Sequence, residues 1–327
     1  MKNPLVSIII PTRNNHDRIE HLLKLLKKQS YSNIELIISD ALSNDGTREI
    51  AKKYGAKIID NAELLAEPGV TIGMSAASGD VLMVLAVDNY FYNSEDLEKI
   101  VRVFDNPQIF AAFPKHESKK NYSIYSKYIN TFTDPFNHFV YGYAANARTF
   151  KKVYSTLENN DSYDVYDFSS SAVKPILAFA QGFTIRKGYM RDMNDSLDDI
   201  MPILKMITER RKIAYIHCVN LFHDTIRDTQ HFLRKMEWAA SNALTCQNYG
   251  ISKRESTLTG WQKFKKVLFP IYALSFVFPS IVAIYFASTE KKIIWLFHPI
   301  ITFITGYAII KQILIKSFGF TPTISRL

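Results

Sequence analysis

Two long runs without a charged residue lie near the C-terminus and restrict how this chain can fold. Residues 267–288 and 293–310 contain no Asp, Glu, Lys or Arg, and only four residues separate them. A helix needs about 20 mainly apolar residues to cross roughly 30 Å of hydrocarbon. A connection this short makes the two helices antiparallel neighbours. The pattern therefore predicts a transmembrane hairpin of two helices within residues 267–327, preceded by a juxtamembrane helical linker over 236–266.

Basic and amphipathic residues flank both runs: Trp261, Lys263, Lys265, Lys266, Lys311 and Lys316. Because lysine-rich flanks stay on the cytoplasmic side of a membrane, we expect the N-terminal region and the C-terminus to be cytoplasmic. Pro270 and Pro279 leave two alternatives open. The hairpin could be buried in a soluble protein, or it could lie in the membrane interface without crossing it.

A net charge of +9 could indicate a nucleic-acid partner, but the distribution of this charge along the chain argues against one. Eight of the 40 basic residues but only one of the 31 acidic residues, Glu290, lie from Trp261 onward, which leaves the first 260 residues at +2. The basicity thus belongs to the apolar tail, and no nucleic-acid partner is expected. Two cysteines exclude a disulfide scaffold and a zinc site with several thiolates. The start, MKNPLVSIIIP, does not predict a cleavable signal peptide.

Short apolar runs alternate with amphipathic segments in the first ninety residues. Strands are expected at residues 5–10, 34–38, 56–59 and 81–87, and helices at 19–26, 48–54 and 70–78. Strands separated by helices of this length indicate an α/β fold, with a mostly parallel sheet covered by helices on both faces. Ligands of such sheets bind beyond the carboxyl ends of the strands.

Polar residues follow three of these strands. They are Thr12, Arg13, Asn14 and Asn15, then Asp40, Ser43 and Asp45, then Asp88 and Asn89. Each group alone is compatible with a turn or a helix cap, whereas together they predict one polar crevice. No glycine-rich dinucleotide or P-loop fingerprint occurs in the chain. Carboxylates in a crevice without a phosphate loop suit a divalent cation, Mg or Mn, that also binds a diphosphate.

Two segments resemble the nucleotide-sugar-binding half of glycosyltransferase family 2, which has the Rossmann-like GT-A fold. They are SIIIPTRNN at residues 7–15 and ELIISDALSNDGTREIAKKYGAKII at residues 35–59. The usual family text is close to V-D-S-G-S-T-D-x-T, and Asp40, Ser43, Asp45 and Thr47 fall in register with it. The resemblance implies a GT-A domain over residues 1–235, with a nucleotide-sugar-binding half at 1–115 and an acceptor half at 116–235.

The resemblance also implies roles for individual residues. Those expected to bind the nucleotide sugar are Pro11, Thr12, Asn14, Asp40, Ser43, Asp45 and Asp88. Asp88 matches the last carboxylate of the family's D-x-D motif, which binds the metal, but Ala86 stands where the first acid is expected. His223, in VNLFHD, stands where some relatives supply a metal or diphosphate contact. The metal is therefore expected at Asp88 and His223, with one acid fewer than usual.

Asp198 and Asp199 stand where the family usually has an E-D pair, in the stretch SLDDIMPILK. A transferase that inverts the anomeric carbon in one displacement needs a base for the proton of the acceptor. The resemblance implies that Asp199 is this base, with Asp198 as the next candidate. Alternatively, both residues only begin the helix expected at 200–209 and stabilise its dipole.

Taken together, the resemblance implies a membrane-anchored, inverting glycosyltransferase. It would move a sugar from a UDP- or GDP-linked donor to an acceptor at the cytoplasmic membrane face, with a lipid-linked saccharide as the expected acceptor in glycan assembly. One alternative is a synthase that glycosylates polyprenyl phosphate directly. Another, suggested by Ala86, is a non-catalytic membrane subunit that binds nucleotide sugars.

Overall fold

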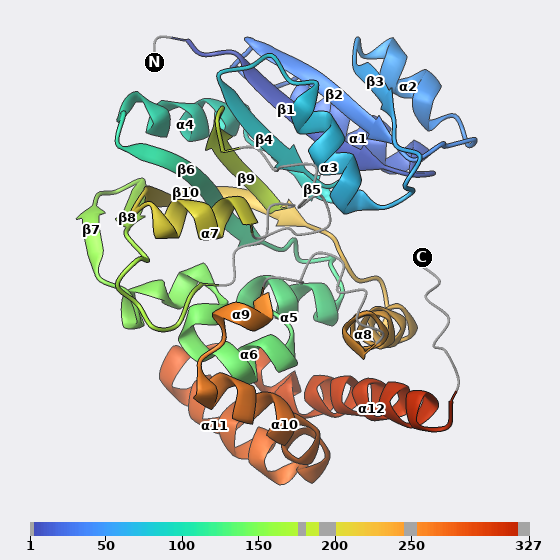
Figure 1. The fold of residues 1–327 in the computed structure, drawn as a ribbon, viewed down its shortest axis with the longest axis vertical. Helices are drawn as coiled ribbons and strands as arrows, with labels where there is room; N and C mark the ends of the chain where they lie inside the picture. Colours follow the sequence, from blue (N-terminus) through green and yellow to red (C-terminus); the bar gives the residue numbers. More distant parts are fainter. Residues whose placement is uncertain (1–2, 176–180, 190–200, 245–253, 320–327) are drawn as a thin grey trace. The chain divides into compact units, whose positions relative to one another are not determined.

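The computed structural model describes residues 3–175, 181–189, 201–244 and 254–319, which form two compact units (Figure 1). The first, here called the sheet unit, comprises the described residues within Met1–Glu117, Tyr154–Ser171 and Leu177–His223. The second, the helical unit, comprises those within Ser118–Val153, Ala172–Ile176 and Asp224–Leu327. Residues 118–153 are thus grouped with the C-terminal helices, although the chain enters and leaves them directly from the sheet unit.

Ten described strands form one sheet. They are β1 (Val6–Thr12), β2 (Ile34–Asp40), β3 (Lys57–Asp60), β4 (Val81–Leu85), β5 (Asn89–Tyr90), β6 (Ile109–Glu117), β7 (Thr156–Asn159), β8 (Tyr163–Tyr166), β9 (Gln181–Arg186) and β10 (Lys212–His223). The helices of this unit are α1 (His16–Leu26), α2 (Thr47–Lys53), α3 (Ala66–Ser75), α4 (Asp96–Arg102), η1 (Val103–Asp105) and α7 (Met201–Thr208). The strands and helices expected in the first ninety residues are all present, with ends that shift by a few residues.

The strand order is β3-β2-β1-β4-β9-β6-β10-β8-β7, and β5 pairs with the end of β10. The four strands β3, β2, β1 and β4 are parallel, as expected. Beyond them the sheet is mixed, because β9 runs antiparallel to both β4 and β6, and β8 runs antiparallel to β10. The prediction of an α/β sheet is therefore confirmed, with parallel pairing among β3, β2, β1 and β4 and again between β6 and β10.

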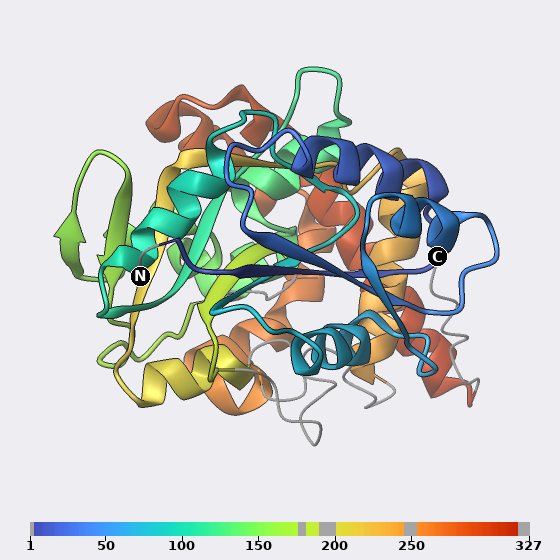
Figure 2. The ribbon, with the colours of Figure 1, turned by 90° about the horizontal axis from the view of Figure 1, so that it is seen from above.

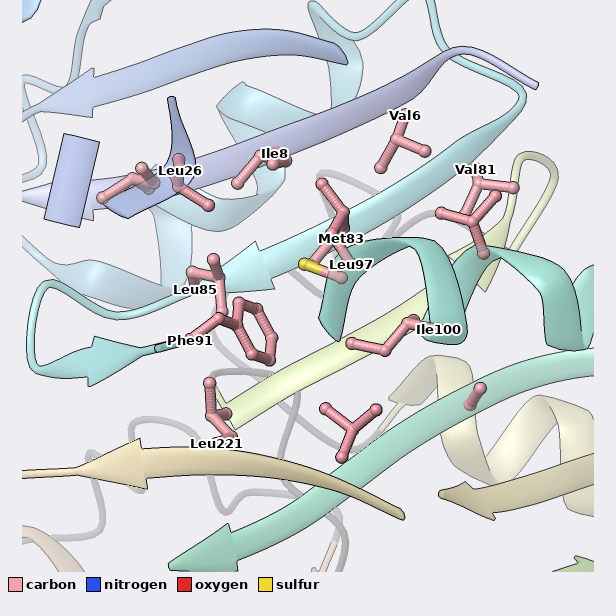
Figure 3. Close-up of a cluster of buried hydrophobic side chains, with 14 of the residues drawn as sticks. Val6, Ile8, Leu26, Val81, Met83, Leu85, Phe91, Leu97, Ile100 and Leu221 are labelled. Atoms are coloured by element: carbon pink, nitrogen blue, oxygen red, sulfur yellow. The ribbon is translucent and has the colours of Figure 1, made fainter. Parts of the chain in front are cut away.

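The central strands are buried on both faces. Figure 3 shows Ile8 of β1 and Met83 of β4 with Leu97 and Ile100 of α4, and all four side chains are fully buried. Burying an aliphatic side chain of this size stabilises the fold by about 1.5–3 kcal/mol. Figure 2 shows that α1 and α3 lie on opposite faces of β1. On the α3 face, a Cβ added to Gly73 would lie 2.4 Å from Cγ2 of Ile9, so only glycine allows this close approach.

The described helices of the helical unit come from two separate stretches of sequence. Its helices are α5 (Ile124–Phe132), α6 (Pro135–Tyr141), η2 (Gly142–Ala145), η3 (Ala147–Lys152), α8 (Thr229–Leu244), α9 (Arg254–Thr257), α10 (Gly260–Ser275), α11 (Val277–Glu290), η5 (Ile293–Phe297) and α12 (His298–Ser317). Side chains cap several of them. Ser123 accepts from Ser126 N–H at the start of α5, and Thr259 forms a capping box with Gln262 at the start of α10.

The apolar tail contains one described helix that is long and apolar enough to span a membrane. This is the continuous helical stretch of 25 residues from Ile293 to Ser317, in which a window of 18 residues has a mean hydropathy of 1.9. The first uncharged run instead forms α10 and α11, which meet at an angle of 91° at Phe276, where φ is +55°. With 16 and 14 residues, these helices are only about 21–24 Å long. The expected hairpin of two spanning helices is therefore not confirmed.

Candidate functional site

The carboxyl ends of β1, β2 and β3 lie at one edge of the sheet. In the parallel register, Thr12 is opposite Asp40, and Asp40 is opposite Asp60. The backbone pairing continues past the strands, because Ala41 N–H donates to the Thr12 carbonyl and Asn61 N–H donates to the Asp40 carbonyl, both at 2.9 Å. The polar residues that follow these strands therefore begin at the same edge, as the sequence predicts.

Hydrogen bonds join the loop after β1 to the loop after β2. Asn14 N–H donates to Ser43 Oγ at 2.8 Å, and Asn44 N–H donates to Asn14 Oδ1 at 3.1 Å. Asn14 has φ +49°, a left-handed conformation that asparagine tolerates better than most residues. Asn14 and Ser43 therefore hold the two loops in place, and direct contact of either residue with a nucleotide stays a prediction.

Asp45 is a second connection between these loops. Its carboxylate accepts from His16 N–H at 3.1 Å and from Thr47 Oγ1 at 2.6 Å, so it links the starts of α1 and α2. Burial raises the pKa of Asp45, but the hydrogen bonds from Thr47 and His16 together outweigh burial and lower it. This geometry is that of a turn residue, which was the alternative reading of Asp45.

Asp40 is fully buried and forms an ion pair. Its carboxylate accepts from Ser43 N–H at 2.9 Å and from Ser43 Oγ at 2.6 Å, and Arg48 Nη1 lies 3.0 Å away. The same nitrogen lies 2.7 Å from Asp60 Oδ1. Asp60, and then Asp40, raise the pKa of Arg48 by stabilising its charge. Arg48 thereby ties α2 to the ends of β2 and β3, and compensates the buried charge of Asp40.

Three buried polar atoms at this edge have no hydrogen-bond partner among the described residues. They are Thr12 Oγ1, Ser39 Oγ and Asn61 Oδ1. A Cβ added to Gly69 of α3 would lie 3.2 Å from Ser39 Oγ and 3.3 Å from Cβ of Pro11, so Pro11 and Ser39 border the same small space. An unsatisfied buried polar group costs about 1–3 kcal/mol, so partners from a bound ligand or from ordered water would stabilise these three atoms.

The end of β4 meets the end of β10. The short strand β5 pairs antiparallel with β10, with His223 opposite Asn89, which brings His223 next to Asp88. Nε2 of His223 lies 3.6 Å from Oδ2 of Asp88, and both side chains are largely buried. The two residues expected to hold a metal are therefore brought together, although they are far apart in the sequence.

Other groups near Asp88 complete the local charge distribution. Arg18 Nη1, from α1, lies 3.9 Å from Asp88 Oδ2, and the amide nitrogen of Asn89 lies 3.3 Å from Asp88 Oδ1. Oδ1 of Asn89 is buried without a partner among the described residues. The ring of His116 lies 5.8 Å from that of His223. The described residues contain no group of three or more His, Cys, Asp or Glu side chains that could hold a metal.

Asp198 and Asp199 lie outside the described residues, so their proposed roles stay predictions. The helix expected after them is present as α7, from Met201 to Thr208. It leads into β10, which ends at His223.

With this geometry in view, residues 7–165 match the family model described as Glycosyl transferase family 2. Residues 7–165 therefore form a glycosyltransferase family 2 domain. The match covers the edge with Thr12 and Asp40 as well as Asp88, and it ends within β8.

Curated relatives of this protein match over its N-terminal part. A 4,4'-diaponeurosporenoate glycosyltransferase of Staphylococcus haemolyticus is 32% identical over 138 residues, which is 39% of this chain and 36% of the relative. Glycosyltransferase AglE of Haloferax volcanii is 34% identical over 94 residues, 26% of this chain and 31% of the relative. The matched region thus spans about a third of the length of either relative.

Solved structures show the same fold over most of the chain. The mannosyltransferase PcManGT of Pyrobaculum calidifontis, in complex with GDP-Man and Mn2+, has a TM-score of 0.55 at 13% identity, covering 95% of this chain and 87% of that one. S. aureus TarS 1-349, in complex with UDP-GlcNAc, has a TM-score of 0.51 at 14% identity, covering 96% and 92%. At these identities the likeness establishes a GT-A-like fold.

Four residues of this candidate site could not be predicted from the sequence: Arg18, Ser39, Arg48 and Asn61. Both arginines lie on amphipathic helices, where a charged residue is most often solvated. Ser39 reads as part of strand β2, and Asn61 follows the four-residue strand β3. Its position after a parallel strand was the one signal that could have indicated Asn61.

Proposed function

We propose that this protein transfers a sugar from a nucleotide diphosphate sugar, UDP- or GDP-linked, to an acceptor with inversion of the anomeric carbon. The observation that supports this best is the pairing of two features at adjacent strand ends. Buried polar atoms without partners lie at the ends of β1, β2 and β3, and the Asp88–His223 pair lies beyond β4, the neighbour of β1. The first suits a base and ribose, and the second suits a diphosphate.

The nucleoside would bind at Pro11, Thr12, Ser39 and Asn61. Thr12 and Ser39 have hydroxyl groups that donate and accept, and Asn61 Oδ1 accepts from a base N–H. Asp40 would border this position and keep its geometry through Arg48. Asn14, Ser43 and Asp45 would act mainly by fixing the loops around it, since their polar atoms already bond to one another's loops.

A divalent cation fits the groups around Asp88, provided that diphosphate oxygens complete its ligands. Asp88 and His223 would hold it, and Asn89 offers an amide oxygen that has no partner among the described residues. A bound Mg or Mn would neutralise charge on the leaving diphosphate. Arg18, within 3.9 Å of Asp88, would supply a fixed positive charge to the same diphosphate. PcManGT, which shares the fold, was solved with GDP-Man and Mn2+.

We assign the base to Asp199, with Asp198 as the next candidate. A carboxylate within hydrogen-bond reach of the acceptor hydroxyl would take its proton as the oxygen attacks the anomeric carbon. The bond from that carbon to the diphosphate oxygen breaks in the same step, and the nucleoside diphosphate leaves with the electron pair.

The acceptor would be a lipid-linked saccharide at the cytoplasmic membrane face, with the protein attached through residues 260–318. Large apolar side chains of this region, such as Val267 and Ile271, are exposed in the helical unit. A chain that keeps such a surface in water would be prone to aggregate, so a membrane partner accounts for it. A polyprenyl phosphate acceptor would meet the same requirement.

A donor screen with Asp199→Asn tests this function. Thermal shift with UDP- and GDP-sugars plus Mn2+ or Mg2+ identifies the donor by its stabilisation of the folded state. Transfer to lipid-linked saccharide and to polyprenyl phosphate then separates the two acceptor classes. We expect Asp199→Asn to lower transfer by about 10²–10⁴-fold with donor binding unchanged. Unchanged turnover would refute the base assignment, with Asp228→Asn, an exposed acid, as the control.

Ala86 supports a second candidate, a membrane subunit that binds nucleotide sugars without turnover. It leaves Asp88 as the one carboxylate of the motif, and the positive charge of Arg18, 3.9 Å away, partly offsets the charge with which that carboxylate would hold a cation. Donor stabilisation without hydrolysis or transfer, for every donor and acceptor in the screen, would favour this candidate over the transferase.

A further inference from the structure

The exposed apolar surface of the chain is concentrated on α10, α11 and α12. Among the described residues, 20 of the 24 large apolar side chains that are exposed lie between Trp261 and Phe318. On α10 they recur at three- and four-residue spacing and form one stripe along the helix: Trp261, Phe264, Val267, Ile271 and Leu274. The opposite side of α10 contributes Phe269 and Ala273 to the interior of the helical unit.

The other two helices repeat this arrangement. On α11 the exposed stripe is Val277, Phe278, Ile281, Ile284 and Tyr285, and on η5 and α12 it is Ile293, Leu296, Phe297, Ile300, Phe303, Tyr307 and Leu314. Their buried sides include Ala283, Ile301 and Ala308. Each helix therefore has a packed apolar side and a second apolar side that no part of the described chain covers.

The loop between α11 and η5 folds back on residues 118–153. Glu290 Oε1 lies 3.6 Å from Nζ of Lys152, and the ring of Trp295 stacks on Phe132 with centroids 3.8 Å apart. Lys152 lies two residues before the sheet unit resumes at Tyr154. In a spanning hairpin this loop would lie across roughly 30 Å of hydrocarbon from the cytoplasmic side, where Lys152 could not reach it.

Helix α10 contacts the same stretch. Lys265 Nζ donates to the Phe139 carbonyl at 2.7 Å, and Tyr272 stacks on Phe139 with centroids 4.4 Å apart. Side chains near the start of α10, in the second half of α10 and at the end of α11 thus all contact residues 132–152. Helices that lie along the surface of the helical unit would make such contacts along their whole length. Helices that cross a bilayer would move away from that surface and lose them.

The long apolar helix α12 is also held at both ends. Near its start, His298 is hydrogen-bonded to Tyr128 of α5, and near its end Lys311 forms an ion pair with Glu237 of α8 at 2.7 Å. Figure 1 shows α8 beside α12, and α8 carries Arg234 and Lys235 as well as Glu237. A helix with these charges has no place in a hydrocarbon core, so its companion α12 would not cross one.

We propose that α10, α11 and α12 form a monotopic anchor that lies in the plane of the membrane interface and does not cross the bilayer. The exposed stripes would enter the boundary between headgroups and acyl chains. Anionic lipid headgroups are the matching partner, since Lys263, Lys266, Lys291, Lys292 and Lys316 accompany the stripes while Glu290 is the one acid from Trp261 onward. This inference rests on the membrane attachment in the proposed function and specifies its mode.

The sidedness of the loop before η5 tests the inference. Thr289→Cys in a Cys246→Ser background would be compared with native Cys218, which is exposed in the sheet unit. Sealed inside-out and right-side-out vesicles from cells that express the full chain would be treated with an impermeant maleimide, with detergent-treated vesicles giving full labelling. We expect both cysteines to react only in inside-out vesicles. Labelling of Thr289→Cys from the opposite side, or from neither side, would overturn the inference.

Vesicle binding tests the surface itself. The purified full chain should sediment with vesicles of phosphatidylglycerol and phosphatidylcholine, and bind more weakly to phosphatidylcholine alone or at high salt. Ile271→Glu combined with Ile300→Glu should weaken binding by about tenfold or more, while Leu157→Glu, an exposed leucine on β7, should not. Unchanged vesicle binding of the double variant would overturn the inference. If light scattering showed that the double variant had lost a dimer while it still bound vesicles, the apolar surface would be a contact between two copies of the chain, and this result would also overturn the inference. Neither experiment depends on transfer, so a failed donor screen would leave it standing.

Discussion

Two aspartates at strand ends of the same sheet have opposite environments. Asp40, the last residue of β2, is fully buried, and its three closest donors lie within 3.0 Å. Asp88, after β4, retains some exposure, and its neighbours Asn89, His223 and Arg18 lie at 3.3, 3.6 and 3.9 Å. A carboxylate has about four acceptor positions, so Asp40 is largely satisfied by the protein and Asp88 is not.

The difference suggests that Asp40 mainly supports the fold at this edge of the sheet, whereas Asp88 is available to bind a ligand. The Asp40 side is already a closed network in which Ser43 and Arg48 fix the loops. On the Asp88 side the hydrogen bond from the Asn89 amide to the carboxylate is long, at 3.3 Å, and nitrogens of His223 and Arg18 lie 3.6 and 3.9 Å away, close enough to share a ligand with it. We therefore expect substitutions on the Asp40 side to affect folding first, and substitutions on the Asp88 side to affect transfer first.

The largest effect is expected from Asp88→Asn. The change keeps the shape but removes the charge that would hold the cation, so transfer should fall by about 10³-fold, on the order of 4 kcal/mol of activation free energy. Steady-state kinetics with a titration of Mn2+ would measure it. The melting temperature should stay close to that of the native chain, because the contacts of Asp88 are long. Asp17→Asn, a fully exposed acid on α1, is the matched control, and a normal metal titration for Asp88→Asn would refute the role.

Asp40→Asn should act mainly on stability. It leaves Arg48 without its buried partner and weakens both bonds from Ser43, so the free energy of unfolding should fall by about 2–4 kcal/mol. Asp60→Asn provides the control on the same arginine, because Asp60 is 65% exposed and should cost less than about 1 kcal/mol. Urea denaturation of both variants would compare them. Equal losses would mean that burial does not distinguish the two carboxylates.

The sequence predicted which residues lie at the carboxyl ends of the parallel strands better than it predicted contacts between residues far apart in the chain. Thr12 and Asp40 could be placed together because parallel strands end at a common edge, and strand period and turn residues are local signals. The proximity of Asp88 and His223 came only from family resemblance. It depends on the two-residue strand β5 pairing with the end of β10, which no hydrophobic period reveals.

The apolar C-terminal region shows what hydropathy alone could not predict. Residues 267–288 are uncharged throughout and read as one apolar helix, yet the chain turns by 91° at Phe276. Hydropathy measures the affinity of a segment for an apolar environment, and this affinity is the same whether the partner is a lipid core, an interface or a protein interior. The contacts of Glu290 and Lys265 with residues 132–152 distinguish these cases, and they depend on tertiary structure.

Ser39→Ala should separate ligand binding from stability on the Asp40 side. Its hydroxyl oxygen is buried without a partner among the described residues, so removing it should stabilise the ligand-free protein by up to about 1 kcal/mol. Donor affinity should fall by about fivefold to tenfold, because the nucleoside loses one hydrogen bond. Thermal melts with and without the donor would measure both. Ser126→Ala is the control, since Ser126 Oγ donates to the Ile226 carbonyl and its loss should destabilise the chain without affecting the donor. Weaker folding with unchanged donor affinity for Ser39→Ala would contradict the placement of the nucleoside.

The smallest effect concerns the pH dependence contributed by Asp45. Its folded pKa lies below the ordinary value of 3.8, because the hydrogen bonds from Thr47 and His16 outweigh the opposing effect of burial. The carboxylate therefore stabilises the folded chain at pH values above about 4, where it is ionised in both states. As the pH falls below 3.8 the unfolded chain takes up the proton first, and this stability is lost. Asp45→Asn should accordingly reduce stability by less than about 1 kcal/mol at pH 7, and the difference from the native chain should shrink below pH 3.8. Urea denaturation at pH 7 and pH 3.5 would measure it, and a difference that grows on acidification would show that Asp45 does not hold the loops through its ionised form.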